Sequence, residues 1–239
     1  MPRGRLNNLE TFEYQGHELD IFVHAKRWKQ YWASRIERWI CGDVLEVGAG
    51  LGHNTVLLQN ERVRSWYCLD PDAQLVAALR ENVARISACS VGNGTIPSVS
   101  DRRFDTILYI DVLEHIENDR EELAAAARLL RSHGRLVVLA PAHNFLFSAF
   151  DAAIGHKRRY NKRSLRACSP QQCHLEGIFY LDGAGITLSL ANRLLLRQSY
   201  PTLRQIKTWD TWFVPISRVI DPILRYRVGK SIIAVWTRL

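Results

Sequence analysis

Two spacings of apolar residues alternate along the chain. Short, nearly continuous apolar runs are typical of strands that are buried on both faces. Such runs occur at 43–48, 65–70, 104–113 and 134–142. The intervening segments place apolar residues at the spacing of helices. These helical segments are 51–60, 71–86 and 117–132. Strand and helix in regular alternation predict a parallel sheet covered by helices on both faces.

The two ends of the chain extend this pattern. Residues 17–40 carry apolar and aromatic side chains at a spacing closer to helix than to strand, so a helix is expected before the first strand. Later in the chain we predict a strand at 173–181, a helix around 184–198 and a closing strand at 229–238. The segment 193–227, before that last strand, is basic and aromatic.

Composition is that of an ordinary globular protein, with 47% of the 239 residues hydrophobic and 23% charged. This length suits one substantial core, and we expect a single domain. The formal net charge of +8 favours an anionic partner: nucleic acid, a phospholipid surface or a phosphorylated substrate. Five cysteines without a C-x-x-C pair indicate neither a disulfide framework nor a zinc site.

The N-terminal residues MPRGRLNNLETFEYQGHELD are polar and lack the apolar stretch of a signal peptide. No window approaches the roughly 18 uncharged apolar residues of a membrane-spanning helix. We therefore expect a cytoplasmic protein. Peripheral contact with a membrane is a secondary expectation, carried by the basic and aromatic segment.

Three alternate glycines follow the first predicted strand, in the stretch VLEVGAGLGHNT. A glycine-rich turn between a strand and a helix lets the backbone approach a ligand closely. A phosphate-binding P-loop would need a lysine after the glycines, and none is present. The dinucleotide fingerprint G-x-G-x-x-G is not matched either, because Gly48, Gly50 and Gly52 alternate and His53 stands at the sixth position.

Glu46 precedes these glycines, and the resulting E-x-G-x-G-x-G pattern resembles the first motif of the class I S-adenosylmethionine-dependent methyltransferases. A carboxylate suits this ligand, which carries a cationic sulfonium and a cationic ammonium and no phosphate. Asp70 ends the second predicted strand, where a carboxylate can accept hydrogen bonds from both ribose hydroxyls of this cofactor or of NAD. We expect Asp70 and the following Pro71 at the cofactor; Asp70 as a helix cap is the alternative.

The run YIDVLEHIEND (109–119) closely matches the fourth motif of methyltransferases that resemble the quinone-biosynthesis enzymes. This resemblance implies that Asp111 lies at the methionyl end of the cofactor and that Glu114 and His115 lie near the mouth of the site. In the alternative, Glu114 is a first-turn acid of the next helix and His115 packs beside it. Asp111, Glu114 and His115 are also a conceivable metal set, but we expect no metal.

Residues 90–105 resemble the stretch of this family that brackets adenine, with Gly94 and Thr95 at the matching places. The acid often found there is absent, and Asn93 is the nearest polar substitute.

Residues 141–165 resemble the P...D...GH.RRY stretch of bacterial class I methyltransferases that act on small molecules or suspected lipid-linked sugars. His156 is the best candidate for a general base, because imidazole titrates near neutral pH. His143, Tyr160 and His115 are further catalytic candidates. The basic residues of this stretch are either a solvated helix start or, as an Arg pair, a clamp for an anionic acceptor.

The predicted fold is a Rossmann-like, seven-stranded, mostly parallel sheet with helices on both faces, an N-terminal helix and a helical insert before the last strand. Within one domain we expect a helical cap (1–40), a cofactor-binding core (41–142) and an acceptor side (143–239).

The predicted function is methyl transfer from S-adenosylmethionine to a small acceptor, hydrophobic or lipid-linked, with segment 193–227 forming a wall of the acceptor pocket. The alternatives are an RNA methyltransferase, which lacks a recognisable RNA-binding module here, and a non-catalytic cofactor-binding partner protein. The sequence indicates no oligomeric state.

Overall fold

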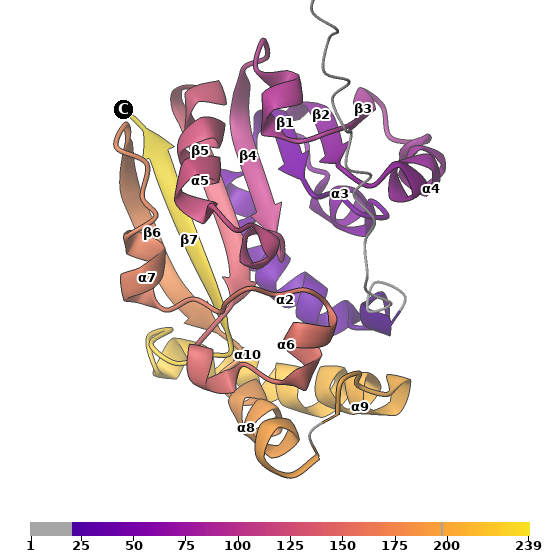
Figure 1. Ribbon diagram of the computed structural model, residues 1–239, viewed down its shortest axis with the longest axis vertical. Helices are drawn as coiled ribbons and strands as arrows, with labels where there is room; N and C mark the ends of the chain where they lie inside the picture. Colours follow the sequence, from indigo (N-terminus) through magenta and orange to yellow (C-terminus); the bar gives the residue numbers. More distant parts are fainter. Residues whose placement is uncertain (1–20, 197) are drawn as a thin grey trace, which may run out of the picture.

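The computed structural model describes residues 21–196 and 198–239, which form a seven-stranded sheet with helices on both faces (Figure 1). The strand order is β3-β2-β1-β4-β5-β7-β6. Strands β1 to β5 are parallel to one another, and β7 runs antiparallel between β5 and β6. The strands are β1 (Gly42–Val47), β2 (Val63–Asp70), β3 (Cys89–Asn93), β4 (Phe104–Ile110), β5 (Leu130–Pro141), β6 (Cys173–Leu181) and β7 (Ser231–Arg238).

The helices alternate with these strands as far as β5. They are α2 (Lys26–Ile36), α3 (His53–Leu58), α4 (Ala73–Val83), α5 (Asp119–Leu129), α6 (Ala149–Ala153), α7 (Lys162–Arg166), α8 (Gly185–Ala191), α9 (Leu203–Thr208) and α10 (Val214–Ile223). Two short helices, α6 and α7, lie between β5 and β6, and the helical insert, α8 to α10, lies between β6 and β7. Two π-helical segments, Asn192–Leu196 and Trp209–Phe213, follow α8 and α9. Short 3₁₀ turns at Glu37–Trp39, Ile96–Val99, Leu113–His115 and Asn144–Leu146 complete the secondary structure.

The predicted fold class is confirmed, and six of the seven strands lie where the apolar runs placed them. The run predicted at 104–113 ends earlier, at Ile110, because the chain turns there into the Leu113–His115 turn. The run predicted from 134 begins four residues earlier, at Leu130. No strand was predicted at β3, whose sequence CSVGN is short and only partly buried.

Two hydrophobic cores lie on the two faces of the sheet. On one face, α2, α3 and α4 pack on side chains such as Val44, Trp66 and Val137. On the other face, α5 and α7 pack on the strand residues that come next in the chain, such as Leu45 after Val44 and Val138 after Val137. Alternate residues of one strand therefore enter opposite cores, which is why both faces had to be apolar.

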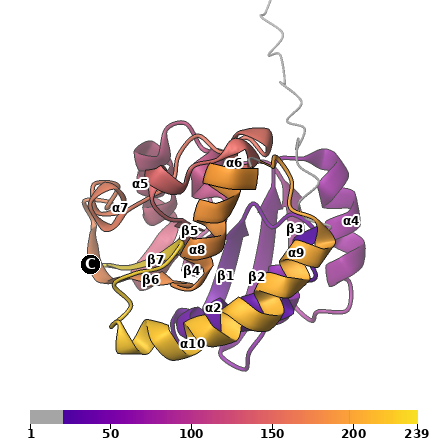
Figure 2. The same cartoon turned by 90° about the horizontal axis from the view of Figure 1, so that it is seen from below.

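The helical insert lies at the edge of the sheet where the parallel strands end (Figure 1). Seen from below, α9 and α10 form one long helical rod that runs alongside α2 (Figure 2). The rod buries Ile206, Trp209 and Val214 in the same core as α2. Part of segment 193–227 is thus core. No helix in the described ranges is long and apolar enough to cross a membrane.

Buried polar contacts attach the insert to the rest of the domain. Asp221 on α10 accepts hydrogen bonds from Tyr31 Oη (2.8 Å), Asp182 N (2.7 Å) and Gly183 N (2.9 Å). Asp182, just after β6, accepts in turn from Trp209 Nε1 at 2.8 Å. Because these carboxylates are buried and hydrogen-bonded, they fix the position of the rod.

Candidate active site

The glycine turn between β1 and α3 adopts backbone conformations that favour glycine. Gly48, Gly50 and Gly52 have φ values of +66°, +55° and +77°, all in the left-handed region. A Cβ on Gly48 would lie 2.6 Å from Val112 Cγ2, and one on Gly52 would lie 2.7 Å from Leu79 Cδ1. Two of the glycines are therefore favoured by close packing against Val112, which follows β4, and against α4, as well as by the turn.

Asp70 ends β2 beside this turn, as predicted. Its Oδ2 accepts from the backbone N of Gly50 at 2.8 Å, and its Oδ1 accepts from the N of Asp72 at 2.9 Å. Burial raises its pKa. The alternative of Asp70 as a helix cap is wrong, because Asp72 caps α4 by accepting from Gln74 N and Leu75 N. Pro71 precedes this cap, outside the helix expected to start there.

Glu46 is buried in β1, in the layer between the sheet and α2. Its Oε2 accepts from Thr55 Oγ1 at 2.5 Å and from Trp66 Nε1 at 3.0 Å, while its Oε1 accepts no hydrogen bond from the described residues. Burial raises its pKa to about 7. A buried carboxylate oxygen without a donor fits the cationic ammonium of S-adenosylmethionine.

Asp111 follows β4 in a left-handed conformation (φ +54°), and its backbone N donates to Leu139 O at 2.9 Å. Its side chain is exposed, although the surrounding protein raises its pKa to about 6. The charges of His156, Lys29 and Lys230 act in the opposite direction. Two lysines and the imidazole of His156, from three different segments, therefore act on the carboxylate that follows β4.

The turn after β4 places two further predicted residues beside His156. The oxygen Glu114 Oε1 lies 3.7 Å from His156 Nε2, and the rings of His115 and His156 meet edge to face with centroids 4.7 Å apart. Glu114 is fully buried, neither of its carboxylate oxygens accepts a hydrogen bond from the described residues, and burial raises its pKa well above the ordinary value. Burial lowers the pKa of His115 to about 4, which keeps this ring neutral at neutral pH.

His156 is held from its other side by Asp151. His156 Nδ1 lies 2.9 Å from Asp151 Oδ1, and Arg159 donates to both oxygens of Asp151, at 2.7 and 3.0 Å. Burial acts to raise the pKa of Asp151, but the hydrogen bonds from His156 and Arg159 lower it below the ordinary value. Asp151 is thus ionised, and the Nδ1 that faces it carries the proton.

The other two candidates of this stretch have different surroundings. Tyr160 is buried, and its hydroxyl donates to Asp119 Oδ2 at 2.8 Å, an oxygen that also pairs with Arg158 at 3.0 Å. Burial and this hydrogen bond raise the tyrosine pKa. His143 stacks on Tyr180 with ring centroids 4.7 Å apart, and burial lowers its pKa.

The predicted adenine stretch, residues 90–105, begins in β3 and continues into the loop after it. Gly94 has a φ of +149°, and its backbone N donates to Asp70 O at 3.0 Å, so this loop is attached to the end of β2. Thr95 is exposed at the start of the 3₁₀ turn. The side-chain amide of Asn93 donates to the carbonyls of Asp70 and Pro71, both at 3.0 Å, so its nitrogen holds the chain.

Three side chains in the described part of the chain could hold a metal ion. One ligand atom from each of Glu114, His115 and His156 lies within 4.8 Å of the others. This set differs from the one considered from sequence, because His156 from the later stretch takes the place of Asp111.

Three residues around this site were missed in the sequence analysis. Lys29 comes from α2 and Lys230 from the residue before β7, and no local pattern marks either as a neighbour of Asp111. Asp151 is different, because it is the acid of the D...GH.RRY pattern and could have been chosen as the partner of His156. Both arginines of that pattern bind protein carboxylates, Arg158 that of Asp119 and Arg159 that of Asp151.

Comparison with known proteins shows which proteins this chain is similar to. Residues 45–138 match the family model described as a methyltransferase domain. Two probable S-adenosylmethionine-dependent methyltransferases from strains CDC 1551 / Oshkosh and H37Rv of Mycobacterium tuberculosis are each 28% identical to this chain over 151 residues. The match covers 62% of this chain and 54% of each relative, so the chain spans about half the length of the curated relatives it matches.

Solved structures share the fold over nearly the whole chain. Geranyl diphosphate methyltransferase in complex with S-adenosylmethionine superposes with a TM-score of 0.65 at 11% identity, covering 94% of this chain and 91% of that one. A complex of the Haloferax volcanii Trm112 methyltransferase activator with a methyltransferase gives 0.59 at 16% identity, covering 92% of both chains. The sequence match over residues 45–138 and the shared fold make this chain similar to S-adenosylmethionine-dependent methyltransferases.

Proposed function

We propose that this chain transfers a methyl group from S-adenosylmethionine to a small hydrophobic or lipid-linked acceptor, with His156 as the general base. Residues 41–142 bind the cofactor in this proposal, and residues 143–239 bind the acceptor. Residues 21–40, the described part of the predicted cap, contribute α2 and its Lys29.

The cofactor is bound by residues at the ends of β1, β2 and β4. Glu46 meets the ammonium group, the glycine turn approaches the ligand with its backbone, and Asp70 accepts the ribose hydroxyls. Asp111 lies at the methionyl end, and Pro71, Gly94 and Thr95 border the adenine. The unpartnered oxygen of Glu46 and the left-handed glycine turn support this assignment.

S-adenosylmethionine supplies a methyl group already activated by sulfonium. The protein therefore has to align the acceptor and accept one proton. Because Asp151 holds the Nδ1 proton of His156, the Nε2 atom carries the lone pair and faces Glu114 and His115. In this proposal Nε2 takes the acceptor's proton, and the ionised Asp151 at Nδ1 stabilises the imidazolium that results.

A row of aromatic rings supports a hydrophobic acceptor. Phe150 precedes Asp151 on α6, and its ring centroid lies 6.1 Å from that of Phe22 and 6.3 Å from that of Tyr200. Phe22 in turn contacts Trp209 of the insert at 6.2 Å. These rings connect α6 to the insert next to the proposed base. A neighbour of the same fold is named for geranyl diphosphate, an apolar chain with an anionic group.

The Asp151–His156–Glu114 arrangement beside Asp111 is the observation that carries this proposal. Calorimetry with S-adenosylmethionine and, separately, NAD tests the cofactor; heat with NAD alone would overturn it. Comparison of metabolites between a deletion strain and its parent identifies the acceptor as the compound that lacks one methyl group.

With that acceptor, His156→Gln is expected to lower turnover by about 10² to 10⁴ while cofactor affinity stays unchanged. His143→Gln is the matched control, because His143 stacks on Tyr180. An unchanged turnover in His156→Gln together with a loss in His143→Gln would transfer the role to His143.

A macromolecular acceptor is the second candidate. The net charge of +8 and the likeness to a methyltransferase described with a Trm112 activator support it. A nucleic acid acceptor predicts salt-dependent binding of RNA by the purified chain. Binding that is absent at low ionic strength removes this candidate.

A further inference from the structure

An apolar stripe faces outward on the helical rod of the insert. Trp212, Ile216, Val219 and Ile223 have 67%, 50%, 64% and 73% of their surfaces exposed. Their spacing of four, three and four residues places all of them on one face of the rod. An exposed apolar face of this length marks an interaction surface.

The inward face of the same rod is already occupied. Trp209, Val214, Ser217 and Asp221 alternate with the stripe and are buried. Ser217 Oγ donates to Asp182 at 2.5 Å, and Asp221 accepts from Tyr31 and from two backbone N–H groups. The rod therefore cannot rotate its apolar stripe into the core without breaking these buried contacts.

The exposed charged side chains on and beside the rod are all positive. Residues 198–230 are all described, and the two acids among them, Asp210 and Asp221, are both buried. The exposed charged residues of this stretch are Arg204, Lys207, Arg218, Arg225 and Arg227. A partner with an apolar interior and an anionic surface complements both features.

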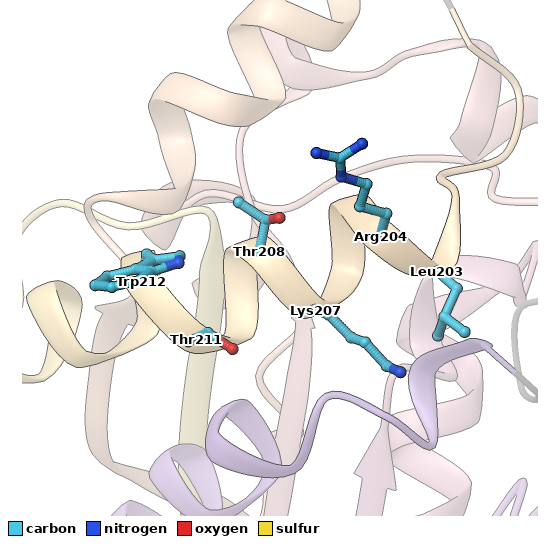
Figure 3. Close-up of a pocket in the computed structure, with 6 residues that line it drawn as sticks. All are labelled: Leu203, Arg204, Lys207, Thr208, Thr211 and Trp212. Carbon is cyan, nitrogen blue, oxygen red and sulfur yellow. The ribbon is translucent and has the colours of Figure 1, made fainter.

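Four of these five cations lie beyond the ends of the apolar stripe, and Arg218 lies within its span. Figure 3 shows Arg204 and Lys207 on α9, on the rod that continues to Trp212. Leu203, Arg204, Lys207, Thr208, Thr211 and Trp212 line one open groove along α9 and the start of the π-helical segment. At the other end, Arg225 and Arg227 lie with Ile223 and Leu224 around a second hollow.

We propose that the rod formed by α9, the π-helical segment and α10 docks on an anionic lipid bilayer. Trp212, Ile216, Val219 and Ile223 enter the interface, and the flanking arginines and lysine contact lipid headgroups. The rod lies at the edge of the sheet where the parallel strands end, so docking brings the candidate active site close to the membrane (Figure 1). This inference concerns a surface and does not depend on the proposed chemistry.

Tryptophan fluorescence gives a direct test without cofactor or acceptor. Trp212 is the one exposed tryptophan among seven, all in the described ranges; the other six are at most 7% exposed. Iodide should therefore quench mainly Trp212 in the protein alone. Vesicles of phosphatidylcholine with phosphatidylglycerol should protect it from iodide at low salt, and vesicles of phosphatidylcholine alone should not.

Two pairs of variants locate the surface. Ile216→Ser with Val219→Ser should abolish the protection, whereas Leu239→Ser with Val56→Ser, which removes exposed apolar groups elsewhere, should leave it intact. Arg204→Glu with Lys207→Glu should weaken vesicle binding about tenfold or more. The matched control is Arg85→Glu with Arg103→Glu, two cations that are also exposed.

Several outcomes would overturn the inference. The first is that anionic vesicles at low salt do not protect Trp212 from iodide, and the second is that neutral vesicles protect it equally well. The third is that Ile216→Ser with Val219→Ser leaves this protection unchanged. Concentration-dependent shielding of Trp212 from iodide without vesicles would mean that a second copy covers the stripe. The thermal shift caused by S-adenosylmethionine shows that each variant is folded.

Discussion

At the residue scale, Asp70 and Asp72 are two neighbouring carboxylates with different partners. Asp72 caps α4, so Asp72→Ala should destabilise the protein by about 1 kcal/mol with little effect on cofactor affinity. Asp70→Ala removes the proposed ribose acceptor, and the loss should weaken cofactor binding about tenfold or more. Denaturant unfolding and calorimetry on both variants measure the two effects. Equal cofactor affinity in Asp70→Ala and the wild type would remove Asp70 from the ribose site.

Glu46 should make stability depend on pH. Its pKa is about 7 in the folded protein against 4.5 for an ordinary glutamate. The folded state therefore keeps a proton that the unfolded state has lost, and stability falls as pH rises from about 4.5 to about 7. The loss is at most on the order of 3 kcal/mol.

Glu46→Gln should flatten this dependence, because an amide oxygen can still accept from Thr55 and Trp66 without any charge. Urea unfolding of both proteins between pH 5 and pH 8 measures how the free energy of unfolding changes with pH. The difference between the wild type and Glu46→Gln is the contribution of Glu46. The same pH dependence of stability in both proteins would mean that Glu46 is charged in the folded protein from pH 5 to pH 8.

At the element scale, the sequence predicts best the strands whose apolar runs are long enough to report their own burial. The long apolar runs of β1, β4 and β5 report burial on both faces directly. β3, α6 and α7 are each five residues long, so none offers enough positions for a period to emerge. The positions of Asp70 and Asp111 were predictable because both end parallel strands.

The start of α2 depends on a contact that no local pattern contains. Its own N-cap residue makes no side-chain cap, and Asp210 of the insert takes that role by accepting from Trp28 N at 2.8 Å and Arg27 N at 3.1 Å. Asp210→Ala should destabilise the protein by about 1 to 2 kcal/mol, because two amide donors lose their acceptor. Asp210→Asn should retain only part of the stability, since its one side-chain oxygen can accept from Trp28 N or from Arg27 N but not from both. Denaturant unfolding of the two variants tests this, and equal losses would show that charge matters more than the hydrogen bonds.

At the scale of the whole molecule, the candidate site combines residues that the sequence separates widely. The motifs named Asp111, Glu114, His115 and His156, and the fold brings them together at the carboxyl end of β4. Lys29 and Lys230 come from opposite ends of the chain and act on the charge of Asp111 only because α2 packs on the sheet and β7 is one of its strands. The apolar stripe was also hidden, because the sequence alone does not separate outward Trp212 from inward Trp209.

Cofactor binding at this junction should stabilise the whole domain. A ligand that binds only the folded state at one hundred times its Kd adds about 2.7 kcal/mol, which for a domain of this size raises Tm by roughly 5 to 11 °C. S-adenosylmethionine should therefore raise Tm, and NAD should not, because Glu46 and Asp111 would repel a pyrophosphate.

Gly50→Ala is the informative variant for this measurement. Its Tm without ligand reports the strain of an alanine at a φ of +55°, and the further shift with S-adenosylmethionine reports binding separately. We expect a lower starting Tm and a much smaller ligand shift, because a methyl group enters the turn that the ligand approaches. A full ligand shift in Gly50→Ala would mean that the turn serves only the packing of β1, β4 and α4, and that the cofactor is bound elsewhere on the sheet.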